Sequence, residues 1–321
     1  MKVIGIGNAL VDVLIRLDDE SLLKELGFPK GSMQLVDAET SKLIAEKTKK
    51  YNKEMASGGS AANTIHGLAR LGVETAFIGV VGRDKTGKFF EDDMKKSGIK
   101  PLLFKSDSPS GIATAMITKD GERTFGTFLG AAVELSAGMI TKELFEGYDI
   151  LHIEGYLVQN HQLIEKALKL AKDNGMKVSL DLASFNVVEE NLDFLKEMVK
   201  RYVDILFANE EEAKAFTGLA PENALIELAR ISEISIVKVG SKGSMIKQGD
   251  TVVNIEPVKA NPIDTTGAGD IYASGFLWGY VNNLGFEKAG YAGSLLAATV
   301  IEVIGAKFDN EKWDEIKKRL V

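Results

Sequence analysis

The chain has 321 residues, a formal net charge of −7 and 45% hydrophobic residues, which is enough for one large core. The acidic balance argues against nucleic-acid binding, which needs a basic patch, and the absence of cysteine excludes disulfides and thiolate chemistry. Because three histidines are too few for a nitrogen- and sulfur-ligated zinc site and no stretch approaches ~20 apolar residues, we expect a cytoplasmic α/β protein with no membrane span.

The first fifty residues predict three strands and two helices. The apolar residues of Val11–Leu17 alternate, as in a strand with one buried face, and Asp12 lies between them. Gly27 and Pro29 end the first helix, and Gln34 lies in the third strand. The expected elements are strands over 2–7 and 11–17, a helix over 19–26, a strand over 33–36 and a lysine-rich helix over 38–51.

Paired glycines precede the next helix. The segment Ser57-Gly58-Gly59-Ser60-Ala61-Ala62-Asn63 leads into a helix that continues through Leu71. Glycines at such a position let the backbone approach a ligand closely, and Asn63 projects from the first turns of the helix. Taken alone, the segment is more typical of a glycine-rich turn with a serine cap.

Residues 100–128 change to short extended pieces. The turn Lys119-Asp120-Gly121-Glu122 joins two of them as a hairpin. Together with residues 12–36, these pieces predict a small sheet beside the main domain. It would form a lid that is inserted within a single domain of residues 1–321. The extended pieces cover 102–104, 112–118 and 123–128.

From Asp149 onward, strands and helices alternate regularly, which predicts a parallel, doubly wound sheet. Ligands of such sheets bind at the carboxyl ends of the strands, where Asp181, Asn209 and Gly240 lie. The expected strands cover 150–153, 177–181, 205–208 and 234–239, and the helices between them cover 161–174, 188–199 and 210–230. A hairpin over 243–256, two apolar helices from about 267 and 286, and a charged helix over 312–320 follow.

The most informative stretch is Asp264-Thr265-Thr266-Gly267-Ala268-Gly269-Asp270, a loop that becomes a helix. Gly267 and Gly269 leave room for a ligand, and the first amides of the helix converge there with the positive end of its dipole. An anion site results. Asp270 would compete with that anion unless it acts as a general base beside a phosphate. The alternative is an ordinary helix cap.

Two familiar motifs occur only in part. Gly82–Phe89 has the glycine and lysine spacing of a Walker A loop, but Phe89 replaces the hydroxyl residue that holds magnesium. The run Gly5–Leu10 begins like a dinucleotide fingerprint and lacks its third glycine. A dehydrogenase is therefore a weak alternative. The histidines are expected to be structural; they are His66, His152 and His161.

Three segments together resemble the ribokinase/PfkB family of carbohydrate and nucleoside kinases: Gly58–Asn63, Asn209–Glu212 and Asp264–Asp270. Their order and spacing fit, and the resemblance covers essentially the whole chain. It implies a three-layer αβα domain with a mostly parallel sheet and a β-sheet lid. It also implies ATP-dependent phosphoryl transfer to a hydroxymethyl oxygen. An exposed edge of the lid sheet would be open to pairing with a second subunit as a homodimer.

The same resemblance implies roles for the reacting groups. Asp270 would be the general base on the acceptor hydroxyl, and the backbone of Gly267, Ala268 and Gly269 would form the anion hole for the transferred phosphoryl group. Arg123, on the lid hairpin, matches an arginine that reaches the phosphates.

On the donor side, Asn209 and Glu212 match an Asn-x-x-Glu motif that helps to place Mg²⁺, partly through water. Without the resemblance, they would read as an acidic helix start. Asp264 would lie near a monovalent-cation site, which makes K⁺ an implied cofactor beside Mg²⁺ and ATP. The residues implied to line the nucleotide are Asn209, Gly240, Ser241, Gly243, Gly267 and Gly269.

On the acceptor side, Asp12 and Asn63 match residues that bind sugar hydroxyls, and carboxylate and amide oxygens suit that task. Gly59 and Ser60 lie close by in the sequence. Asn8 and Gln34 match residues of the adenosine kinase branch. Three apolar residues would form a slot for a purine or would simply be core residues of the lid; they are Leu10, Val36 and Phe125.

The middle of the chain is closer to ribokinases, through Gly58–Asn63, and Glu154 would suit the pocket of a sugar kinase. The sequence therefore predicts an ATP-dependent kinase of the 5′-type hydroxyl of a nucleoside such as adenosine. A ribokinase- or fructokinase-like sugar kinase is the alternative. A non-catalytic nucleotide or sugar sensor is the alternative of another class.

Overall fold

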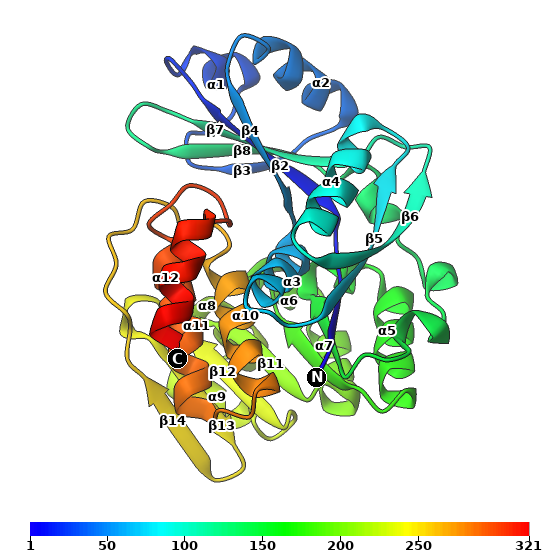
Figure 1. Cartoon of the computed structure of the whole chain (residues 1–321), viewed down its shortest axis with the longest axis vertical. Coiled ribbons are helices and arrows are strands. Elements are labelled where there is room, and N and C mark those ends of the chain that lie inside the picture. Colours follow the sequence, from blue (N-terminus) through cyan, green and yellow to red (C-terminus); the bar gives the residue numbers. More distant parts are fainter. Residues whose placement is uncertain (321) are drawn as a thin grey trace.

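The larger of two sheets organises residues 1–320, which a computed structural model describes (Figure 1). Its nine strands lie in the order β14-β13-β12-β11-β10-β9-β1-β5-β6. The strands from β12 to β6 are parallel, and β13 and β14 form an antiparallel hairpin at one edge. The bounds are β1 Val3–Ile6, β5 Thr75–Gly82, β6 Ile99–Ser106, β9 Ile150–Glu154, β10 Lys177–Asp181, β11 Ile205–Asn209, β12 Ile234–Lys238, β13 Ser244–Gln248 and β14 Thr251–Ile255.

Helices cover both faces of this sheet because its central strands are apolar on both sides. Successive residues point to opposite faces, so Val3 and Ile205 join one buried cluster, while Ile4 and Leu206 join the other. The three-layer αβα prediction is confirmed. The helices are α3 Ser60–Arg70, α4 Lys85–Lys96, α5 His161–Asp173, α6 Phe185–Glu190, α7 Leu192–Tyr202, α8 Glu210–Thr217, α9 Pro221–Leu228, α10 Ala268–Val281, α11 Phe286–Val300 and α12 Asn310–Leu320.

Two of the expected helices are each divided. The segment over 210–230 forms α8 and α9, because Gly218 ends α8 in the left-handed region (φ 77°) and Pro221 begins α9. The segment over 188–199 starts earlier, as α6, and breaks at Asn191 before α7. No helix between residues 1 and 320 is long and apolar enough to cross a membrane.

The second sheet is a five-stranded lid in the order β3-β8-β7-β2-β4. In Figure 1 the lid and its two helices, α1 and α2, lie at the top, beyond the main domain. Alternate residues of its strands, such as Val13 and Ile15, are buried with Leu22 of α1 and Ile44 of α2. The bounds are β2 Leu10–Arg16, β3 Met33–Leu35, β4 Lys53–Gly58, β7 Gly111–Ile117, β8 Arg123–Phe128, α1 Ser21–Leu26 and α2 Ala38–Lys47.

The lid differs from the expected segments at two places. The piece over 102–104 belongs to β6, which pairs with β5 at the edge of the large sheet. The lid instead gains β4, which the sequence did not indicate because Lys53, Glu54 and Ser57 break any apolar alternation. An edge strand needs only one partner, so such a polar sequence is tolerated there.

Candidate active site

A cleft of about 2100 Å³ lies at the carboxyl ends of the large-sheet strands, between the start of α10 and the lid. Four adjacent parallel strands, β9 to β12, each end in a polar residue that lines it: Glu154, Asp181, Asn209 and Lys238. This is the position expected for a ligand in a doubly wound sheet. The cleft therefore joins the end of the sheet to the predicted anion site.

The start of α10 forms one wall. Gly267 precedes the helix with φ 72°, and a Cβ there would lie 2.6 Å from the Ala306 Cβ, so only glycine fits. The first helical bond runs from the Ile271 N–H to the Gly267 carbonyl at 2.9 Å. The preceding amides of Gly269 and Asp270 therefore have no acceptor within the helix. These free amides lie at the positive end of the α10 dipole, where an anion is favoured.

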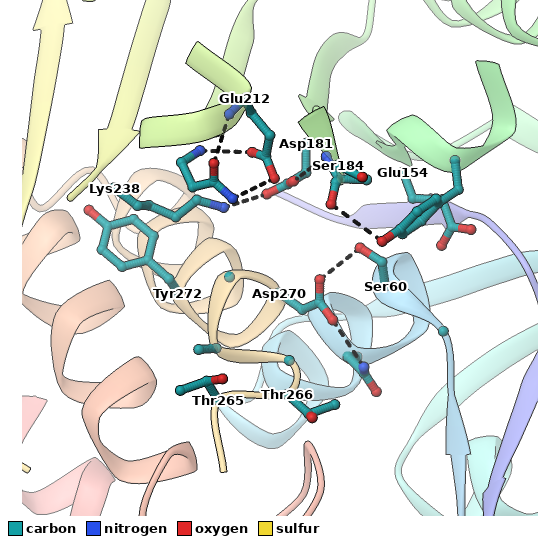
Figure 2. A pocket seen from close by; sticks show the side chains of 18 of the residues that line it. Ser60, Glu154, Asp181, Ser184, Glu212, Lys238, Thr265, Thr266, Asp270 and Tyr272 are labelled. Carbon is teal, nitrogen blue, oxygen red and sulfur yellow. Dashed lines mark hydrogen bonds and ion pairs between the residues drawn. The ribbon is translucent and has the colours of Figure 1, made fainter. Parts of the chain in front are cut away.

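Asp270 is held by two side chains from the first turn of α3. Ser60 Oγ donates to Oδ1 at 2.7 Å and Asn63 Nδ2 donates to Oδ2 at 3.0 Å (Figure 2). Burial raises the pKa of Asp270 to about 7, although both hydrogen bonds act to lower that pKa. The carboxylate is thus oriented, and its pKa suits a general base at neutral pH.

Glu154 braces the frame of the site. Its Oε1 accepts from the backbone N–H of Asn8 at 2.9 Å and from Asn8 Nδ2 at 2.6 Å, and its Oε2 accepts from the Ala61 N–H at 2.9 Å. The side chain is buried. Glu154 therefore ties the junction of β1 and β2 to the start of α3. Gly59 lies against the same junction, since with φ 100° its Cβ would meet the Asn8 carbonyl at 2.1 Å.

Asp12 supplies a second carboxylate to the cleft, from the lid. It lies over Gly58, where a Cβ would come within 2.2 Å of Asp12 Oδ2. Burial raises the pKa of Asp12 to about 6, against the lowering effect of the Lys307 charge. Asn63 Oδ1 is buried without a partner among the described residues. The predicted acceptor residues that line the cleft are Asn8, Asp12, Gly59, Ser60 and Asn63.

Gln34 lies away from that group. In β3 the neighbours Met33 and Leu35 line the cleft, whereas Gln34 points to the other face of the strand and donates to Ser32 Oγ at 2.9 Å. The apolar wall of the cleft also differs from the predicted slot. Leu10 and Phe125 line it, and Met33 and Leu35 stand where Val36 was expected.

Arg123 extends from β8 to the loop before α10 and does not line the cleft. Its Nη1 lies 3.3 Å from Thr266 Oγ1 and forms an ion pair with Asp264. Asp264 is buried, and it accepts the Thr266 N–H on Oδ1 and the Gly305 N–H on Oδ2, both at 2.7 Å. The lid is therefore connected directly to the loop before α10. Of the residues predicted for the site, the cleft omits Gln34, Arg123, Asp264 and, from the apolar slot, Val36.

Asn209 and Glu212 form a closed capping box at the start of α8. Glu212 Oε2 accepts the Asn209 N–H and Oε1 accepts Asn209 Nδ2, both at 2.7 Å, while Asn209 Oδ1 accepts the Glu212 N–H at 2.8 Å. Burial, with the nearby Asp181 charge, raises the pKa of Glu212. Because the carboxylate is already hydrogen-bonded, these residues fit Mg²⁺ held through water better than direct ligation. Residues 1–320 contain no cluster of three acidic, histidine or cysteine ligands.

Lys238 is the site residue that the sequence did not reveal. It ends β12, its side chain is 14% exposed, and its Nζ donates to Asp181 Oδ2 at 2.8 Å. The predicted strand continued to Val239, so Lys238 read as an interior position. The lysine that follows Ile236 and Val237 at the end of a parallel strand was the available signal. The cleft is also lined by Gly240, Ser241 and Gly243, which were predicted to line the nucleotide.

Comparison with known proteins gives one family. The model of the pfkB family of carbohydrate kinases matches residues 32–313. An uncharacterized sugar kinase of Archaeoglobus fulgidus is 30% identical over 243 residues, which are 75% of this chain and 96% of that protein. A nucleoside kinase of Methanocaldococcus jannaschii is 30% identical over 272 residues, which are 82% and 85% of the two chains.

A solved structure extends the likeness to the whole fold. The adenosine kinase of Sinorhizobium meliloti superposes with a TM-score of 0.87 at 32% identity, over 99% of both chains. The similar proteins thus divide between nucleoside and sugar kinases.

Proposed function

Because this chain belongs to the pfkB family of carbohydrate kinases and is a phosphotransferase, we propose that it phosphorylates the 5′-type hydroxyl of a nucleoside such as adenosine with ATP. The observation that carries the proposal is the position of Asp270. Its carboxylate lies at the start of α10 beside the free amides, is oriented by Ser60 and Asn63, and shares one cleft with Asp12.

The proposed chemistry is a single in-line transfer. The acceptor hydroxyl gives its proton to Asp270 while its oxygen forms a bond to the γ-phosphorus, and the bond from that phosphorus to the bridging oxygen of ADP breaks. The amides of Gly267 and Gly269 would stabilise charge on the transferred group, whereas the Ala268 N–H, also predicted for this role, is donated to the Thr265 carbonyl at 3.2 Å. Such a donor array contributes ~3 kcal/mol in the transition state.

The proposal includes Mg²⁺, which when bound neutralises phosphate charge and aligns the leaving group. Asn209 and Glu212 would hold it through water. Their capping box keeps four polar groups together at the end of β11, and burial, with the charge of Asp181, raises the pKa of Glu212. A nearby dication would restore the ionised carboxylate.

The lid supports a nucleoside as the acceptor. Met33 and Leu35 are 60% and 69% exposed and face the cleft with Leu10 and Phe125. Apolar side chains that converge on a pocket favour a planar base, which stacks on them and covers their surface. The carboxylate of Asp12 is then available for ribose hydroxyls. On this proposal, Gln34 does not contact the nucleoside and affects binding only by shaping β3.

A sugar kinase is the second candidate. Asp12 and the buried, unpartnered Oδ1 of Asn63 would serve a free sugar equally well, and the Archaeoglobus fulgidus relative carries a sugar kinase name. In that case the apolar lid residues would face solvent or close onto one another. The affinity for a free sugar would then owe nothing to Met33 and Leu35.

The test is ADP release from magnesium-ATP in the presence of adenosine, other nucleosides, ribose and fructose. We expect turnover with adenosine or another nucleoside and a kcat/KM for ribose at least about 100-fold lower, because stacking contacts are lost. A preference for ribose or fructose would establish the sugar kinase instead. Calorimetric binding of ATP and adenosine without any turnover would favour the non-catalytic sensor.

Two parts of the proposal concern the surroundings of the site. K⁺ near Asp264 would have to share a buried carboxylate that already contacts Arg123, so K⁺ activation is expected to be small in wild type and larger in R123M. Replacing choline chloride with KCl in the assay measures the K⁺ activation.

A homodimer would form through the free edge of β4. Sedimentation velocity of wild type and of M55K, a substitution on that strand, tests the dimer.

A further inference from the structure

Lys238 is a buried cation next to the proposed anion hole. A Cβ placed on Gly269 would lie 3.0 Å from Lys238 Nζ, so the ammonium lies directly against the first turn of α10. In Figure 2 the Lys238 side chain extends from β12 toward Asp181, with Asp270 on the facing helix. A full positive charge and the positive end of a helix dipole thus converge on one point. Asp181 offsets part of this charge at 2.8 Å, and an anion bound between the ammonium and the helix would offset the rest.

The hydrogen bonds of Lys238 leave capacity for that anion. An ammonium has three N–H donors, and Asp181 Oδ2 accepts one at 2.8 Å. Asp181 is itself fixed, because its Oδ1 accepts the Ala183 N–H at 2.9 Å. Lys238 also lines the cleft. Its other donors can therefore reach the oxygens of a group bound there.

The surrounding charges keep Lys238 protonated. Burial would lower its pKa, but the carboxylates of Asp181 and Glu212 outweigh burial and raise it. Asp270 also acts in that direction. Lys238 is therefore a fixed cation and not a proton carrier.

We infer that Lys238 is a catalytic residue that binds the γ-phosphoryl oxygens and neutralises the charge that develops on them during transfer. Asp181 is the positioning residue that holds the ammonium. This rests on the proposed phosphotransfer to a hydroxyl. The acceptor oxygen–phosphorus bond forms, the bond to ADP breaks, Asp270 takes the hydroxyl proton, and Lys238 keeps its own proton throughout. Fixed cations in a desolvated site are effective here because the transition state carries its charge on those oxygens.

The experiment compares K238M, K238R and D181N/K238M with wild type, using Mg·ATP and the acceptor that the panel identifies. We expect K238M to lower kcat by at least about 100-fold, with the Kd of ADP unchanged within threefold, and K238R to recover part of the loss. The double variant also removes the charge of Asp181, the carboxylate that pairs directly with Lys238, so it should fold and stay as slow as K238M. Recovery of kcat in D181N/K238M would assign the loss to a stranded Asp181 and overturn the inference.

Two further results separate this inference from the proposed function. If wild type turns over no acceptor, the proposed function fails, and calorimetry then tests Lys238 alone. K238M should weaken ATP binding by about tenfold relative to ADP. Equal losses for ATP and ADP, or a kcat within tenfold of wild type, would show that Lys238 only supports the structure. The matched control is K172M, which removes a lysine from another 2.8 Å ion pair, with Asp204 at the opposite end of the same sheet.

Discussion

The two ends of strands β10, β11 and β12 carry clusters built from the same residue types. At the amino ends, the two carboxylate oxygens of Asp204 accept hydrogen bonds from Lys172 Nζ, at 2.8 and 2.9 Å. Asp204 also accepts the Val178 N–H at 2.7 Å. Lys177 pairs with Asp204 and with Glu233 there. At the carboxyl ends, Asp181 and Lys238 pair at 2.8 Å. Similar ion pairs thus lie at both ends of these strands.

The difference lies in charge balance and burial. At the amino ends, two lysines face two acids, the lysine side chains are 34% and 41% exposed, and contact with Glu233 raises the pKa of Lys177. At the carboxyl ends, one lysine faces Asp181, Glu212 and Asp270, and the pKa of Asp270 rises to about 7. An unbalanced, buried cluster costs stability, which is typical of a site that a ligand completes.

Asp270→Asn should break the comparison most severely. Without a base, kcat should fall by about 10³-fold or more, while the Kd of ADP stays within threefold, because the amide keeps the size and planar shape of the carboxylate. Steady-state kinetics and calorimetry measure the two quantities. An activity within tenfold of wild type would reject the general-base role.

Lowering the pH should act on the same carboxylate. A base with a pKa of about 7 must lose its proton to work, so kcat/KM should rise through neutral pH and be about tenfold below its plateau at pH 6. The pH profile of wild type between pH 5 and 9 measures the midpoint. A flat profile over that range would mean that no group with the pKa of Asp270 limits the reaction.

Ser60→Ala should shift that midpoint to higher pH, because the Ser60 hydrogen bond lowers the pKa of Asp270. We expect roughly a fivefold loss at pH 6.5 and near-complete recovery at pH 9. Thr64→Val is the matched control, since Thr64 Oγ1 donates to the backbone carbonyl of Asp270 at 3.0 Å and not to its carboxylate. Equal shifts in both variants would contradict the assignment.

The sequence predicts features that have a local pattern and misses contacts between residues that are distant in the chain. The apolar strands and the glycines around Asp270 produce local patterns, so the αβα fold, the family and the loop before α10 were predicted correctly. Lys238 was missed because one lysine at the end of an apolar run gives no local sign of Asp181, 57 positions away. The partner of Arg123 is even more distant in the sequence, since Thr266 lies 143 positions beyond it.

The sequence pattern did not determine on which face of a strand a side chain lies or with which strand a segment pairs. Gln34 was assigned to the ligand because it matches a residue of the adenosine kinase branch, but a strand reverses its side chains at every residue, and Met33 and Leu35 occupy the cleft face. Strand β4 was absent from the prediction because pairing with β2, and not its own composition, makes it a strand. Long-range pairing has no signature within a single segment.

Asp270→Asn should also raise stability. A carboxylate whose pKa rises from 3.8 to about 7 on folding contributes stability that is complete below pH 3.8 and lost as pH rises through 7. Removing its charge should therefore raise Tm by about 2–4 °C at pH 8 and by less at pH 5. Thermal unfolding at both pH values measures the change. A lower Tm at pH 8 would mean that Asp270 is stabilised by Ser60 and Asn63 more than it is destabilised by burial.

Lys172→Met should have the smallest effect and defines the other side of the comparison. Asp204 keeps Lys177 and the Val178 N–H as partners, so the loss of a partly exposed ion pair should cost no more than about 1 kcal/mol, or roughly 2 °C in Tm. kcat and both KM values should stay within twofold of wild type, because no charge near the cleft changes. Thermal unfolding and steady-state kinetics on one preparation test this. A kcat loss comparable to that of K238M would mean that ion pairs at either end of the strands act through the rigidity of the sheet. The excess charge at the carboxyl ends would then have no separate role in catalysis.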